Sequence, residues 1–203
     1  MFDLPKTSEI RKPLHKKLVY EKYAAELAEN KKDKFDADIS RMIITNEISE
    51  ASVNIKATED ISAIFVLKVE LKRKEYDDKN IIMISKLFGQ KILIVLHYEN
   101  KYQLAIYETR LLKSDWKNEE EISLKLNGLD LGNIWDNFVT QVSGIDVQAG
   151  NTLVEQINVE AEKEKLRKQI ADLESKARKE VQAKKKFEMV QRIQQYKERL
   201  KGI

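Results

Sequence analysis

The sequence contains no cysteine, so a disulfide framework, a cysteine-based zinc site and a thiol nucleophile are all excluded. Histidine is almost absent. Only His15 and His97 occur, which rules out a multi-histidine metal site and disfavours a histidine-based triad. Six glycines and two prolines in 203 residues leave few signals that end a helix, so long helices are expected. Neither G-x-x-x-x-G-K nor G-x-G-x-x-G is present, which argues against an NTPase or a dinucleotide-dependent enzyme.

Long hydrophobic runs are also missing. The longest, Ile61–Val69 and Ile92–Leu96, are far shorter than the roughly 20 residues of a membrane-spanning helix. Residues 1–12 carry charges but no apolar segment follows them, unlike a secretory signal. We therefore expect a cytoplasmic protein with no membrane partner.

Charged residues make up 35% of the chain, against roughly 25% in typical soluble domains. The net charge is only +3, but its distribution is uneven. Residues 151–203 hold 14 Lys or Arg against 9 Asp or Glu, and residues 1–34 are also basic, whereas the middle is net acidic. Two interpretations stay open: solvated helices rich in lysine and glutamate, or a surface that binds polyanions.

The apolar patterns predict an α/β (α+β) protein with a mixed sheet of about five or six strands and packed helices, over residues 1–148. Alternation of apolar and polar residues, or runs of β-branched residues, predict strands at 42–44, 53–55, 64–71, 91–98, 102–109 and 122–126. Helical spacing predicts helices at 7–27, ending near Asn30, at 78–88 and at 131–142.

Residues 149–203 differ in character and predict a basic helical tail. Its apolar residues follow a 4-3-4 rhythm typical of a coiled-coil seam, which is lost across 181–186 and then resumes. Either one long helix with a stutter or a helical hairpin turning near 182–185 fits this pattern. The seam residues are the expected partner-binding set, for another protein or a second copy: Leu166, Ile170, Leu173, Ala177, Phe187, Val190 and Ile193.

Asp60, Glu70 and Lys72 form the catalytic candidate of the sequence. Restriction-type nucleases use an Asp, a spacer and Glu-x-Lys, in which two carboxylates hold Mg²⁺ and the lysine helps to position the attacking water. Strand alternation places Glu70 and Lys72 on one face. The alternative is an ordinary solvated strand face with Lys68, in which case no cofactor is expected.

Basic clusters suggest contact with nucleic acid. On the tail the candidate phosphate-binding residues are Lys179, Lys184, Lys185, Lys186 and Arg192. A second cluster, Lys72-Arg73-Lys74, follows the predicted strand at 64–71. A basic surface that only keeps the protein soluble would have the same composition. His97, in an apolar strand, is interpreted as a core histidine rather than a base.

Several stretches resemble the bacterial domain-of-unknown-function family 4391. They are Leu4-Pro5-Lys6, residues 35–41 (FDADISR), Asn46-Glu47-Ile48, residues 71–74 leading to Asn80-Ile81-Ile82, and Gly150-Asn151-Thr152-Leu153. This resemblance transfers no catalytic residue. It implies a genomic context, because similar proteins are encoded beside DNA methyltransferases and helicase-type ATPases in restriction-like or phage-defence loci.

Three functions are consistent with these observations. The first is a non-catalytic accessory subunit of a DNA-processing assembly, which docks through its tail on a methyltransferase- or helicase-type protein. The second is a Mg²⁺-dependent nuclease centred on Asp60, Glu70 and Lys72. The third is sequence-independent DNA binding through the basic ends of the chain.

Overall fold

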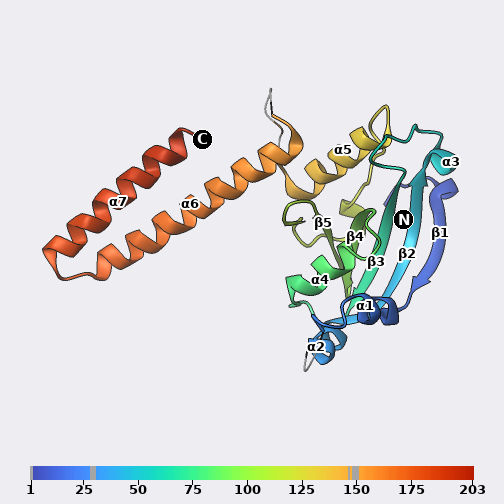
Figure 1. The fold of residues 1–203 in the computed structure, drawn as a ribbon, viewed down its shortest axis with the longest axis horizontal. Coiled ribbons are helices and arrows are strands. Elements are labelled where there is room, and N and C mark those ends of the chain that lie inside the picture. Colours follow the sequence, from blue (N-terminus) through green and yellow to red (C-terminus); the bar gives the residue numbers. More distant parts are fainter. Residues whose placement is uncertain (1, 28–30, 146, 148–150) are drawn as a thin grey trace. The chain divides into compact units, whose positions relative to one another are not determined.

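A computed structural model describes residues 2–27, 31–145, 147 and 151–203 (Figure 1). The chain divides into two compact units, Met1–Gly144 and Ile145–Ile203. The boundary predicted between residues 148 and 149 lies outside the described residues, as does Asn30.

One mixed sheet organises the first unit. Its strands lie in the order of the chain: β1 (Glu9–Leu14), β2 (Ile39–Ser49), β3 (Ala63–Leu71), β4 (Lys91–Tyr98), β5 (Lys101–Tyr107) and β6 (Leu111–Lys113). Strands β3 and β4 are parallel and are joined by a crossover that contains α4 (Asp78–Ser85), whereas all other neighbours are antiparallel. The predicted fold class, a mixed sheet with packed helices and a long helical tail, is confirmed.

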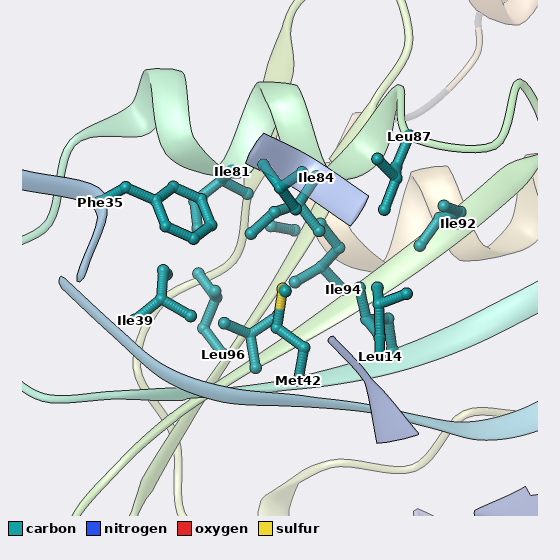
Figure 2. Packing of buried hydrophobic residues seen from close by; sticks show 14 of the residues in the cluster. Leu14, Phe35, Ile39, Met42, Ile81, Ile84, Leu87, Ile92, Ile94 and Leu96 are labelled. Atoms are coloured by element: carbon teal, nitrogen blue, oxygen red, sulfur yellow. The ribbon is translucent and has the colours of Figure 1, made fainter. Parts of the chain in front are cut away.

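One face of this sheet packs against the helices α1 (Lys16–Lys22), α2 (Lys31–Asp38) and α4 (Figure 2). The alternation in β3 and β4 supplies the strand side of the core. The helices supply Val19, Phe35, Ile81 and Ile84, all with no exposed surface. Burial of this apolar area is the main stabilisation of the unit.

The opposite face is covered by α5 (Leu131–Ser143), which contacts β3, β5 and β6. Asp130 caps this helix by accepting from the backbone N–H of Asn133 at 2.8 Å, and Gly144 ends it at φ +66°. Trp135 and Phe138 are buried on its inner side. The prediction of a helix at 131–142 with these two aromatic residues in the core is confirmed.

Both edges of the sheet are irregular or short. Edge strand β1 has a register shift between Glu9 and Lys12, where Arg11 adopts a φ of +49°, and Pro13 lies near its end. The other edge strand, β6, has three residues.

Three sequence predictions were wrong. The helix expected at 7–27 is a short 3₁₀ turn (Lys6–Ser8), then β1, and only then α1. The strand expected at 53–55 is replaced by α3 (Glu50–Val53), whose capping box joins Ser49 and Ser52. Residues 122–126 form no strand, and they follow a 3₁₀ turn at Glu119–Glu121.

The second unit is a helical hairpin of α6 (Leu153–Lys179) and α7 (Ala183–Lys201), so the hairpin interpretation is correct. The chain leaves the helical conformation at Glu180–Gln182, slightly before the predicted turn. Ion pairs between the helices join Glu174 to Lys197 at 2.7 Å and Glu162 to Arg199. Within the described ranges, no helix has the length and apolar character needed to cross a membrane.

The hairpin encloses most of the predicted partner-binding seam. Leu166, Ile170, Ala177 and Ile193 are all at least 91% buried, because the two helices cover each other's apolar stripe. Leu173 is half-buried. Phe187 and Val190 are 62% and 41% exposed, so these two members of the set are surface residues.

Candidate functional site

A polar row crosses four strands at the carboxyl end of the parallel pair. Backbone register aligns Arg41 of β2 with Glu70 of β3, Glu70 with His97 of β4, and His97 with Tyr102 of β5. Lys68, two residues before Glu70, points to the same face. Carboxyl ends of parallel strands are common ligand-binding positions in α/β sheets. We call these five residues the polar row.

Glu70 is the electrostatic centre of the row. Its Oε1 lies 3.1 Å from Lys68 Nζ, 3.2 Å from Arg41 Nη2 and 3.7 Å from His97 Nδ1. Partial burial by itself would raise the pKa of the Glu70 carboxyl, but hydrogen bonds from Lys68 and Arg41 outweigh burial and hold that pKa below its usual value. The carboxylate is therefore ionised and already paired with cations.

The other end of the row forms the wall of an open cavity of about 780 Å³. The His97 ring stacks on Tyr102 with centroids 4.4 Å apart, and the Phe2 ring meets Tyr102 edge-on at 5.4 Å. The Tyr102 hydroxyl donates to Glu119 at 3.3 Å. Burial and the charges of Glu119 and Glu70 raise the pKa of this hydroxyl, so it stays protonated. His97 thus borders solvent instead of lying in a closed core.

The structure does not bring the three predicted catalytic residues together. Asp60 is exposed and lies three residues before β3, whereas Glu70 is near the end of that strand, and the strand from Ala63 to Glu70 alone spans about 23 Å at 3.3 Å per residue. Two carboxylates that share one Mg²⁺ must lie within about 5 Å. Lys72 lies just beyond β3 and is exposed. Across the described residues, no group of three or more His, Asp or Glu is placed to hold a metal ion.

Asp38, a buried carboxylate at the same end of the strands, was not predicted from the sequence. Its side chain has no exposed surface. It accepts from Arg73 Nε at 2.6 Å, from the backbone N–H of Asp77 at 2.9 Å and from Asn80 Nδ2 at 2.9 Å, with a further ion pair to the Arg73 guanidinium. Asp38 therefore ties the end of α2 to the segment after β3 and to the first turn of α4.

A second carboxylate near this edge, Asp36, pairs with α1. Its Oδ1 accepts from Lys16 Nζ at 2.7 Å and from the Tyr20 hydroxyl at 2.6 Å. Burial alone would raise the pKa of Asp36, but the hydrogen bonds from Lys16 and Tyr20 and the charge of Lys72 hold it below the usual value. Asp36 and Asp38 are thus both committed to structural partners, and neither is free to replace Asp60 beside Glu70.

Comparison with known protein families matches residues 2–200 to the family described as "Domain of unknown function (DUF4391)". The chain belongs to the DUF4391 family. No curated protein and no solved structure matches. The buried Asp38 and its partner Asn80 lie in two of the stretches that carry the resemblance, residues 35–41 and 80–82. These stretches therefore include residues of the network that joins the end of α2 to the segment after β3 and to α4.

The ion pairs of Glu70 in the polar row predict how the stability of this DUF4391 protein depends on pH. Glu70→Gln is expected to lower the free energy of unfolding at pH 7 by about 1 kcal/mol, because it removes two charge-assisted hydrogen bonds. The native pKa of Glu70 is depressed, so its contribution is present above the unfolded-state pKa of about 4.3 and is lost as pH falls below it. Denaturant unfolding between pH 7 and 3 measures both effects.

In that experiment, the variant should show a flatter loss of stability than the wild type between about pH 5 and 3. Glu120→Gln, at an exposed position that pairs with none of the described residues, is the matched control. Parallel pH profiles for the wild type and Glu70→Gln would contradict the assignment of Glu70 as a stabilising ion-pair residue.

Proposed function

We propose that this protein is a non-catalytic accessory subunit of a DNA-processing assembly of the restriction-like or phage-defence kind. It docks through the tip of its helical hairpin on a larger DNA methyltransferase- or helicase-type protein. The kind of assembly rests on the family resemblance. The docking role rests on the surface of the hairpin.

The observation that carries this proposal is the apolar exposure at the hairpin tip, which we define as residues 176–192. Val181 is 95% exposed, Phe187 62% and Val190 41%. An exposed phenylalanine beside two exposed valines is costly on an isolated surface, and such anchors become favourable when a partner removes them from water. The buried seam is not involved, because it already holds the two helices together.

The charge of the tip indicates the chemistry of the partner surface. Residues 176–192 hold seven Lys or Arg and two Asp or Glu. Lys184, Lys185 and Lys186 are exposed and form no ion pair with a described residue. A groove of about 570 Å³, lined by Leu173 of α6 and by residues of α7 that include Arg192, adds a concave surface. An acidic protein surface with an apolar centre is complementary to this tip.

Co-purification with a methyltransferase- or helicase-type protein tests the proposal. The double variant Phe187→Asp/Val190→Asp is expected to lose the partner, because it places two charges where apolar anchors are needed. Ala171→Asp, at an exposed position on α6, is a control that adds a negative charge away from the tip. It should retain the partner.

Three outcomes would contradict the proposal. One is a double variant that still co-purifies with its partner, and another is a wild-type protein that never does. The third is capture that disappears on digestion of DNA and weakens steeply with salt, since this would assign Lys179, Lys184, Lys185, Lys186 and Arg192 to phosphate binding. Mg²⁺-dependent DNA cleavage abolished by Glu70→Ala would instead support the nuclease alternative.

A further inference from the structure

A second cavity, of about 470 Å³, lies in the first unit beside α2 and α4. Its volume lies in the range typical of small-ligand sites. Described residues from three segments line it: Glu26 and Leu27, then Lys31 and Lys34 of α2, and then the N-terminal cap and first two turns of α4. None of them belongs to the polar row or to the hairpin tip.

Lysine side chains give this cavity a cationic rim. Lys31, Lys34 and Lys79 line it, and none forms an ion pair with a described residue. Two carboxylates, Glu26 and Asp77, also line it. Asp77 is already used to cap α4, since it accepts from the backbone N–H of Lys79 at 2.9 Å. Three exposed lysines among the lining residues are suited to binding a phosphate group.

The interior wall of the cavity is apolar. Leu27 is 94% buried, and Ile82 and Met83 are half-buried. An apolar wall below a cationic rim fits a ligand with a flat hydrophobic ring and a charged end. Inorganic phosphate alone would leave that wall without a partner.

One polar group in the wall has a fixed orientation. Asn80 is 95% buried and lines the cavity. Its Nδ2 donates to Asp38 Oδ2, and this carboxylate can only accept because its other partners, Arg73 and the Asp77 N–H, are donors. The amide therefore cannot flip. Its Oδ1 accepts from no described residue, so it is an acceptor available to an N–H group of a ligand.

We propose that this cavity binds a phosphorylated nucleoside, either as a free nucleotide or as the 5′-terminal nucleotide of a DNA strand. The lysines hold the phosphate, the apolar wall packs against the base, and Asn80 Oδ1 accepts from an N–H of the base. Asp38 acts as a positioning residue, because it fixes the Asn80 amide.

Fluorescence anisotropy with the full-length chain tests this inference. The probes are single-stranded oligonucleotides labelled at the 3′ end that carry a 5′-phosphorylated adenosine, a 5′-hydroxyl adenosine, or a 5′-phosphorylated abasic site. The first is expected to bind about tenfold more tightly than either of the others, since each lacks one of the recognised groups. Competition by adenosine monophosphate identifies the source: full displacement at similar concentration indicates a free nucleotide, and weak displacement indicates a strand end.

Variants separate the cavity from general attraction to DNA. Lys34→Met/Lys79→Met should weaken binding of the 5′-phosphorylated probe about tenfold. Lys56→Met/Lys125→Met makes the same charge change at exposed positions outside the cavity and should leave binding unchanged. Glu26→Gln removes a carboxylate from the lining, so it should tighten binding.

Equal affinity for the three oligonucleotides would overturn the inference, as would equal loss in the two double-lysine variants. The test is independent of the docking proposal. Phe187→Asp/Val190→Asp should bind the 5′-phosphorylated probe as the wild type does, whether or not the tip binds a protein partner.

Discussion

Asp38→Ala should lower the free energy of unfolding of the first unit by about 3 kcal/mol. The side chain has no exposed surface and joins the end of α2 to Arg73, Asp77 and Asn80, which lie 35, 39 and 42 residues further along the chain. Its removal leaves the Asp77 N–H and the Asn80 amide without their acceptor, and each unsatisfied buried donor costs about 1–3 kcal/mol. The loss of a buried ion pair adds to this.

Urea denaturation followed by tryptophan fluorescence measures this change. Asp33→Ala, an exposed position on the same helix, should stay within about 0.5 kcal/mol of the wild type. Asp38→Asn, which retains one acceptor oxygen, should fall between the two. If Asp38→Ala were as stable as Asp33→Ala, the network would not contribute to the fold in the way its geometry implies.

Leu166→Ala should unfold much of the hairpin while leaving the sheet intact. Leu166 is 97% buried, and truncation of such a residue typically costs 2–5 kcal/mol. Two helices in contact along one stripe have little other apolar area to compensate. Far-ultraviolet circular dichroism should report lost helix, and hydrogen exchange should show lost protection in residues 153–201.

Phe187→Ala is the matched comparison, because Phe187 is an apolar residue of the same seam pattern but is 62% exposed. It should change hairpin stability by less than about 0.5 kcal/mol and act only on docking. If instead Phe187→Ala unfolded the hairpin and Leu166→Ala did not, the assignment of hairpin core and tip surface would be reversed.

The central strands and α5 were predictable from the sequence, because the residue patterns that determine them lie within each segment. Strand β3 alternates apolar and charged residues from Leu67 to Leu71, and β4 is rich in β-branched residues and is bounded by Gly89 and a turn. The helix α5 has an aspartate cap and a glycine end. The hairpin was one of two readings of its heptad pattern, and no Gly or Pro at 180–182 marks the break.

The edge strands were not predictable, because their conformation depends on pairing with distant residues. In residues 9–14 only Leu14 is buried, so the segment has no alternation to detect, and it is held by backbone pairing with residues 42–46 of β2. The apolar residues that follow have helical spacing, and the predicted helix was therefore started too early, so that it included residues 9–14. Strand β6 is too short to carry a pattern.

The candidate site was only partly predictable for the same reason. Glu70 was recognised from its spacing to Lys72, but its partners Arg41 and His97 lie on β2 and β4, and only the sheet register brings them together. Asp60 was chosen because it is near Glu70 in sequence. In the structure β2 runs antiparallel to β3, so the start of β2, and with it Asp38, lies beside the end of β3. The choice required knowledge of strand direction.

The irregular borders of the sheet have a consequence for how copies of the chain behave at high concentration. Unpaired backbone groups at a sheet border recruit strands from other molecules and so seed fibrils. At one border of the sheet, β1 is interrupted by Pro13, by a register shift and by Arg11, whose backbone has a left-handed conformation. At the other border, β6 has three residues. Strand addition is disfavoured on both sides, so this chain is protected against growth by β-augmentation, and self-association would have to proceed through side chains.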